Sequence, residues 1–149
     1  MTKEDKQLLA KDLCARLPYG VKCEIIDTED DLHAVAELNP ITLKSFWGNR
    51  LLVKPYLRPM SSMTEEEGNE LLEFVVGKEG MKYFNVSDNG TIDGNDSAEQ
   101  DLRNFNFHWI NFDCVNTSTY IDWLNSHHFD YRDLIEKGLA IEAFINMYK

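Results

Sequence analysis

The chain has 149 residues, of which 43% are hydrophobic and 11% aromatic, a composition typical of a globular protein that folds without disulfides or metals. Its formal net charge of −11 opposes the approach of DNA or RNA phosphates, because such binding depends on Lys and Arg. No run approaches about 18 apolar residues, and the N-terminal stretch MTKEDKQLLAKDL lacks the apolar core of a signal peptide. We therefore expect a cytoplasmic protein that neither binds nucleic acid nor spans a membrane.

Residues 3–17 have the period of an amphipathic helix. Thr2 followed by Asp5 resembles a capped helix start, and one apolar stripe runs along the segment, formed by Leu9, Leu13 and Leu17. Pro18 and Gly20 are expected to end this helix.

Residues 21–57 predict a meander of three or four antiparallel strands. Apolar and polar residues alternate in four segments, at 21–26, 32–38, 41–47 and 50–57. The dipeptides Asn39-Pro40 and Gly48-Asn49 are typical of turns between them. Because proline has no N–H, Pro55 predicts either an edge strand or an end of pairing at residue 54.

The second half of the chain predicts more helices than strands. Thr64, followed by three glutamates, is a good N-cap for a helix that ends at Gly77. The further expected elements are a hairpin about 88–90, a loop at 93–104, a strand at 105–112, helices from 116 or 117 to 124 and at 130–137, and a strand at 139–141. We expect a single α+β domain over residues 1–149, with an antiparallel sheet packed against about three helices.

The segment 54–67, KPYLRPMSSMTEEE, joins a predicted strand to a predicted helix. Hydroxyl groups at a helix N-terminus can hold a phosphate, but the three glutamates in the same first turn would repel it. If this segment binds anything, a protein surface contacting Tyr56 and Arg58 fits better, and these two are the predicted binding residues.

The strongest candidate for a metal or proton-transfer site is the cluster of His127 and His128 with Asp130 close by. His and carboxylate groups at such short spacing can ligate zinc or exchange protons. Neighbouring residues on a helix point about 100° apart, so both histidines could ligate one ion only at a bend. A helix C-terminus also favours His through its dipole. A structural role is the favoured interpretation, and a metal site at these three residues is the alternative.

Other patterns are weaker. The acidic loop 93–101 resembles a calcium loop but has Ala98 where Gly is needed and Asn104 where a bidentate Glu is needed. Cys114 lies near His108 in sequence without any known thiol-nucleophile signature. The three cysteines form no Cys-x-x-Cys pair, and no glycine-rich phosphate loop occurs. No cofactor is expected.

Two stretches, 54–67 and 121–143 (IDWLNSHHFDYRDLIEKGLAIEA), together resemble an uncharacterised family of small proteins encoded by phages and mobile elements of gut bacteria. The resemblance covers about a quarter of the chain and implies an origin and a setting, but no activity and no site residues. The chain departs from the family pattern at Asp133, where glycine is expected, and at residues 144–146, where a Pro-Glu-Gly-like turn is expected.

These observations favour a non-enzymatic accessory protein of phage or mobile-element origin that binds an unidentified protein in the cytoplasm of a bacterial host. One alternative is a small metal-dependent hydrolase that uses the region of His127 and His128. Another is an acidic inhibitor that mimics nucleic acid, which requires the acidic groups of three segments to share one face: 27–31, 65–73 and 93–101. The sequence indicates neither the partner nor the oligomeric state.

Overall fold

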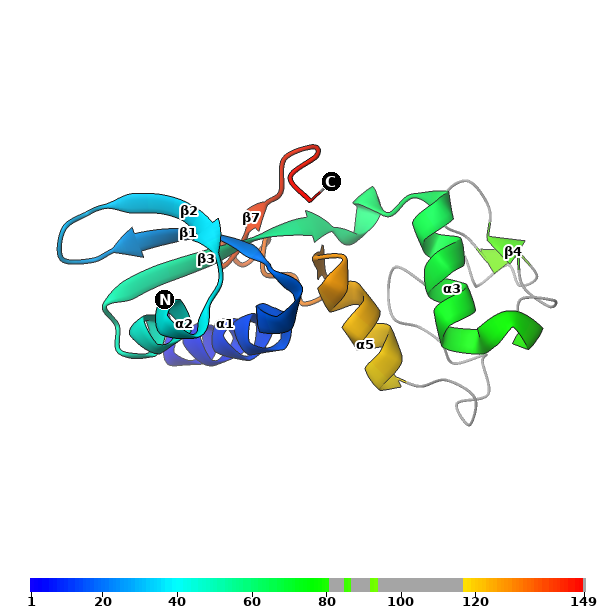
Figure 1. Ribbon diagram of the computed structural model, residues 1–149, viewed down its shortest axis with the longest axis horizontal. Helices are drawn as coiled ribbons and strands as arrows, with labels where there is room; N and C mark the ends of the chain where they lie inside the picture. The colour runs from blue at the N-terminus through cyan, green and yellow to red at the C-terminus, as the bar shows by residue number, and fades with distance from the viewer. Residues whose placement is uncertain (81–84, 87–91, 94–116, 149) are drawn as a thin grey trace. The chain divides into compact units, whose positions relative to one another are not determined.

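The structure, a computed structural model, describes residues 1–80, 85–86, 92–93 and 117–148 (Figure 1). Contacts divide the chain into two compact units, Met1–Pro59 with Asn125–Lys149, and Met60–Leu124, which we call the sheet unit and the acidic-helix unit. The expectation of a single domain stays a prediction. Helices and strands occur together, which confirms the α+β class.

The sheet unit is built around one mixed sheet. Its strands are β1 (Lys22–Asp27), β2 (His33–Glu37), β3 (Leu51–Pro59), β6 (Phe129–Asp130) and β7 (Ile141–Glu142). The order is β2-β1-β3-β6, and β7 also pairs with β3. Strand β1 is antiparallel to both β2 and β3, as predicted for the first half, whereas β6 and β7 run parallel to β3.

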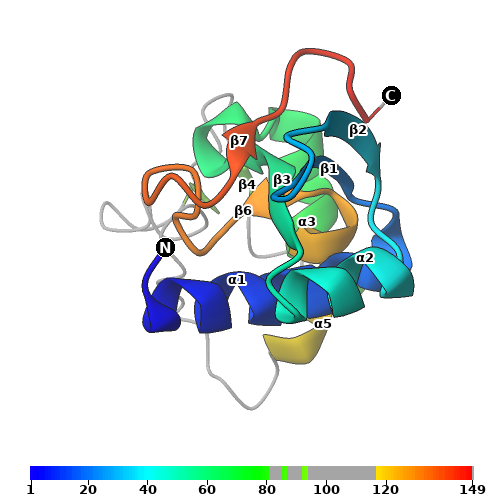
Figure 2. The same cartoon turned by 90° about the vertical axis from the view of Figure 1, so that its left-hand side faces the viewer.

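Helices α1 (Lys3–Arg16) and α2 (Pro40–Trp47) lie on one side of this sheet, and the chain after β7 lies on the other (Figures 1 and 2). The predicted capping box of α1 is present, since the Thr2 hydroxyl accepts from Asp5 N at 3.1 Å and the Asp5 carboxylate accepts from Thr2 N at 2.9 Å. The main core contains twelve buried residues: Leu9, Ala10, Leu13, Val21, Cys23, Leu38, Phe46, Val53, Leu57, Leu134, Leu139 and Ala140.

The strand predicted at 41–47 is wrong, because this segment is helix α2. The Asn39 side chain accepts hydrogen bonds from the backbone N of Ile41 and Thr42, both at 3.0 Å. Pro40 is the first helical residue, where its fixed φ suits the helix and its missing N–H is not needed. The Asn-Pro dipeptide therefore begins a helix rather than making a turn. The meander is wrong as well, since β3 returns beside β1.

Pro55 lies inside β3, and pairing continues past it, so the end of pairing expected at residue 54 is wrong. At Pro55 itself β3 is an edge of the described sheet, as predicted, because β1 alone pairs with residues 51–55, and β7 and β6 pair with β3 only at residues 56–59. Thr28 N donates to Arg50 O at 3.1 Å, so Arg50 and every second residue after it direct their backbone groups toward β1. The nitrogen of Pro55 therefore points away from β1, where no described strand is aligned with it.

The helix predicted at 130–137 is also wrong. After β6 the chain makes successive turns up to residue 138, with left-handed φ values of 56° at Asp133 and 69° at Gly138. The carboxylate of Asp130 accepts from the backbone N of Leu134 and Ile135, at 2.9 and 2.8 Å. Asp130 thus satisfies two backbone donors that a helix would have bonded to carbonyl groups. Near the strand predicted at 139–141 the structure has the two-residue strand β7.

The acidic-helix unit contains α3 (Glu65–Gly80), the hairpin β4 (Asn85–Val86) and β5 (Ile92–Asp93), and most of α5 (Thr117–Ser126). The predicted N-cap is confirmed, since the Thr64 hydroxyl accepts from Glu67 N at 3.2 Å and Glu67 accepts from Thr64 N at 2.9 Å. Helix α3 runs three residues beyond its predicted end. The Trp123 indole joins α5 to α3 by donating to Glu70 at 3.2 Å.

Two predicted elements fall outside the described residues: the strand at 105–112 and most of the loop at 93–104. Among the helices that the structure describes, none combines the length and the apolar character needed to cross a membrane.

Candidate functional site

Tyr56 and Arg58, the predicted contact residues, lie on one face of β3, while Leu57 between them is fully buried on the other. The Arg58 guanidinium carbon lies 4.3 Å from the centre of the Phe129 ring. Its backbone N donates to His128 O at 2.8 Å. Both side chains are half-buried, so the structure brings the two predicted residues together on the face of β3 that α1 and α2 leave uncovered.

The C-terminal turn, residues 143–148, extends this face with apolar side chains. Phe144 and Ile145 are 65% and 87% exposed. The Phe144 ring meets that of Tyr56 edge-on, with centres 6.3 Å apart and planes at 75°. The turn is held at both ends, because Ala143 N donates to the backbone of β3 at 2.7 Å and the Met147 side chain is buried.

The Tyr148 hydroxyl anchors the C-terminal turn by linking two strands. It accepts from Lys22 N at 3.1 Å and donates to Tyr56 O at 2.7 Å. Direct pairing of β1 with β3 stops one residue earlier, so the hydroxyl takes the place of the next backbone pair. Burial raises the pKa of Tyr148, which keeps the hydroxyl protonated and able to donate at neutral pH.

His128 packs beneath this anchor. Its ring stacks on that of Tyr148 with centres 3.8 Å apart, and its backbone is left-handed, with φ of 60°. Burial, followed by the positive charges of Arg16, His127, Arg58 and Lys22, lowers the pKa of His128 from 6.5 to about 4. The imidazole is therefore neutral at pH 7. Its Nδ1 is buried without a hydrogen-bond partner among the described residues.

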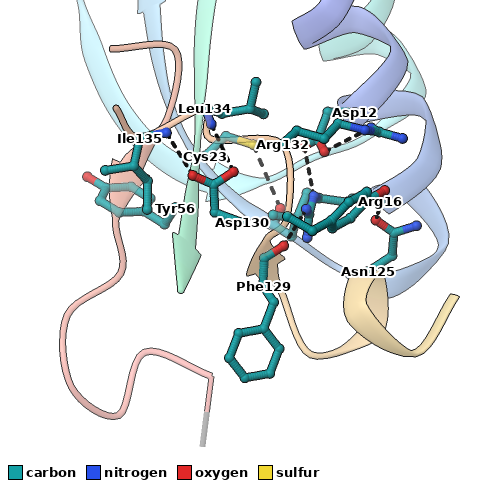
Figure 3. Close-up of polar contacts among 12 residues, drawn as sticks. Asp12, Arg16, Cys23, Tyr56, Asn125, Phe129, Asp130, Arg132, Leu134 and Ile135 are labelled. Carbon is teal, nitrogen blue, oxygen red and sulfur yellow. Dashed lines mark hydrogen bonds and ion pairs between the residues drawn. The ribbon is translucent and has the colours of Figure 1, made fainter. Parts of the chain in front are cut away.

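A buried ionic cluster joins α1 to the chain after α5 (Figure 3). Arg16 and Asp12 are both fully buried and paired at 2.7 Å, and Arg132 donates to the second oxygen of Asp12 at 3.0 Å. Arg16 Nη2 also donates to Phe129 O at 2.7 Å. These contacts orient β6, and hence the Phe129 ring on which Arg58 lies. The cluster is a positioning device, since its charges contact one another.

The three residues of the metal alternative make other contacts. Both carboxylate oxygens of Asp130 accept backbone N–H groups, as Figure 3 shows. His128 stacks on Tyr148, and His127 Nδ1 lies 3.1 Å from Ser126 Oγ. Across the described ranges, no group of three or more His, Cys, Asp or Glu side chains could hold a metal ion.

The thiols of the described residues differ in environment. Cys14 is exposed and Cys23 is buried, and neither forms a disulfide. Burial, with the nearby Asp12 carboxylate, raises the pKa of Cys23 to about 12, so this thiol stays protonated and unreactive. Cys114 and His108, like the calcium-like loop beyond Asp93, lie outside the described residues.

Charge is distributed unevenly between the two units. Residues 60–124 carry 13 Asp and Glu but only 3 Lys and Arg, a net −10. The rest of the chain carries 13 acidic and 12 basic residues, a net −1. Almost all of the acidic excess therefore belongs to one unit, and the sheet unit is nearly neutral.

Sequence reasoning missed Phe144, Tyr148 and the buried cluster. Asp12 and Arg16 stand at i and i+4 in a helix, a spacing that predicts a pair but not its burial. Nothing in the sequence around Phe144 or Tyr148 indicates that a terminal segment returns to β3.

Comparison of the chain with family models, curated proteins and solved structures finds no match.

Proposed function

We propose that the protein is a non-enzymatic binding protein of phage or mobile-element origin, acting in the cytoplasm of a bacterial host, and that its partner contacts the C-terminal turn and Tyr56. The observation that carries this proposal is an exposed apolar tip on an anchored turn. Phe144 and Ile145 reach into solvent, whereas Ala143 before them is hydrogen-bonded to β3, and Met147 and Tyr148 after them are buried or hydrogen-bonded. A contact already held in place loses little conformational entropy on binding.

The charges beside this tip suit a particular kind of partner. Lys54 and Arg58 lie on the same face of β3 as Tyr56, because alternate residues share a face. A protein that offers an apolar pocket for Phe144, with carboxylates at its rim, would pair with these cations. Aromatic and arginine side chains at the centre of an interface contribute most of the binding free energy.

The test compares two exposed phenylalanines. Wild-type protein and the variants Phe144→Ser, Tyr56→Ala and Phe74→Ser are expressed in bacterial hosts, and co-purifying proteins are quantified by mass spectrometry. Phe74 is 54% exposed and lies in the other unit, so it is the matched control. We expect one partner to be recovered about tenfold less with Phe144→Ser and Tyr56→Ala, and equally with Phe74→Ser. Equal recovery with all variants, or no partner in several hosts, contradicts the proposal.

A second candidate, an acidic inhibitor that mimics nucleic acid, is favoured by the net −10 of residues 60–124. Such a unit would compete with DNA for a basic protein. We would measure displacement of labelled DNA from a non-specific DNA-binding protein, with wild type, the triple variant E65Q/E66Q/E67Q and the control D133N. Weaker displacement by the triple variant alone supports mimicry, and no displacement at about 100 µM opposes it.

A further inference from the structure

Strand β2 is the outermost strand of the sheet, and all five of its residues are exposed. Natural proteins usually protect such edges with Lys, Pro or a bulge, because an open edge pairs readily with another strand. The sequence of β2, His-Ala-Val-Ala-Glu, contains neither Lys nor Pro, and its pairing with β1 is continuous. Among the strands that the structure describes, none pairs with this edge, so it is open to a partner strand.

The hydrogen bonds of β2 indicate which backbone groups face outward. Leu38 N donates to Val21 O at 2.8 Å, and Asp27 N donates to Leu32 O at 3.0 Å. Backbone groups of alternate residues point to the same side, so the even-numbered residues of β2 bond to β1. The backbone groups of His33, Val35 and Glu37 therefore point away from β1, along the open edge.

We propose that this edge is where two copies of the chain associate, with β2 antiparallel to β2 of the second copy about a twofold axis through Val35. In that register His33 faces Glu37 of the partner subunit, and each Val35 faces its own counterpart. All three outward residues then lie opposite one another as hydrogen-bonded pairs, in which each pair exchanges both N–H···O bonds. One strand thus supplies both halves of a self-complementary contact, as twofold symmetry requires.

The side chains match this register. On the face away from the helices, each histidine meets a carboxylate that can accept its N–H, on both sides of the central valine pair. On the other face, Ala34 of each copy lies opposite Ala36 of the other copy, and these side chains are small enough to let the two strands approach closely. The imidazole of His33 also lies 3.8 Å from Glu24 and 3.7 Å from Asp31, so it has carboxylates on its own chain as well.

Charge also permits this contact. Two copies of a chain with net charge −11 repel one another, but β2 belongs to the sheet unit, whose net charge is only −1. The contact is short, so the dimer is weak, with a dissociation constant on the order of 10–100 µM. It lies on β2 and leaves Tyr56 and Phe144 untouched, so it is independent of the proposed function.

The first test is sedimentation velocity of the full chain between about 5 and 500 µM, a range that spans the expected dissociation constant. Val35→Lys places two ammonium groups face to face on the axis, and Val35 is 58% exposed, so the monomer should fold unchanged. Ile41→Lys, at a side chain 78% exposed on α2, is the matched control. We expect wild type and Ile41→Lys to dimerise with rising concentration and Val35→Lys to associate at least about tenfold more weakly.

The second test addresses the register. H33E places like charges opposite each other in both symmetric pairs and should abolish association. H33E/E37K restores opposite charges in the same pairs and should recover it. Wild type that stays monomeric throughout, Val35→Lys that associates as strongly as wild type, or a double variant no stronger than H33E, would each overturn the proposal.

Discussion

The two units of this chain use charge in different ways. The sheet unit is nearly neutral and buries an aspartate between two arginines, at distances of 2.7 and 3.0 Å. The acidic-helix unit carries a net −10, and its helix α3 opens with three glutamates in the first turn. A buried charge determines which segments pack together, whereas an exposed charge mainly sets the field at the surface. The same chemical change should therefore have very different costs in the two units.

The largest effect is expected for Asp12→Asn. This change keeps the shape of the side chain but leaves the guanidinium groups of Arg16 and Arg132 without their counter-charge in the interior. Removing one member of a buried ion pair costs about 3–5 kcal/mol of unfolding free energy. Urea unfolding followed by circular dichroism measures it.

Asp133→Asn is the matched control within the same unit, because the pair of Asp133 with Lys137 is exposed and 3.8 Å long. It should cost less than about 0.5 kcal/mol. If the two variants are equally stable, the buried cluster does not organise the sheet unit.

The buried imidazole of His128 predicts a dependence on pH. The unfolded chain takes up a proton as the pH falls through about 6.5, whereas burial holds the pKa in the folded protein at about 4. The stability that depends on neutral His128 is therefore complete above pH 6.5 and is lost as the pH falls toward 4, by about 2 kcal/mol.

This prediction is checked by urea unfolding at several pH values between 7 and about 4.5, where the linkage acts. His128→Asn should flatten the slope, and asparagine tolerates the left-handed backbone at this position. Ile41→Asn, at a side chain that is 78% exposed and does not ionise, should keep the wild-type slope. Parallel slopes for wild type and His128→Asn would contradict the assignment.

The Tyr148 anchor predicts a smaller loss. Tyr148→Phe retains the ring that stacks on His128 but leaves Lys22 N and Tyr56 O without the hydroxyl that links them. The expected cost is about 1–2 kcal/mol. Tyr19→Phe is the control, since the Tyr19 hydroxyl makes no hydrogen bond within the described part of the chain.

Limited proteolysis gives a second readout, because cleavage within residues 143–148 should increase with Tyr148→Phe. Unchanged cleavage and unchanged stability would mean that the hydroxyl does not hold the turn.

Local signals predict where helices are capped better than they predict the type of each segment. Both predicted N-caps, Thr2 and Thr64, are correct because a cap depends on residues three apart. The segment 41–47 is wrongly predicted as a strand because the dipeptide Asn39-Pro40, which elsewhere is typical of a turn, here begins a helix. The turns after Asp130 were mistaken for a helix because its carboxylate satisfies backbone donors locally.

The candidate site was predicted only in part. Tyr56 and Arg58 came from an unusual local stretch, and the structure places them on one face of β3. Their neighbour Phe144 comes from 88 residues farther along the chain than Tyr56. Contacts of this separation depend on tertiary packing, which no short pattern encodes. The same holds for Arg132 at Asp12, whose sequence separation is 120 residues.

The smallest effect is expected for Glu66→Gln, the counterpart of Asp12→Asn in the acidic-helix unit. Glu66 is exposed in the first turn of α3, where the helix dipole stabilises a negative charge by about 0.3–1 kcal/mol. Glu70 lies one turn further on, and like charges at this spacing repel by about 0.2–0.5 kcal/mol. Because the two effects oppose each other, unfolding in urea should shift by less than about 0.5 kcal/mol and still less in high salt. A loss that approaches that of Asp12→Asn would show that the acidic unit, too, depends on its charges for folding.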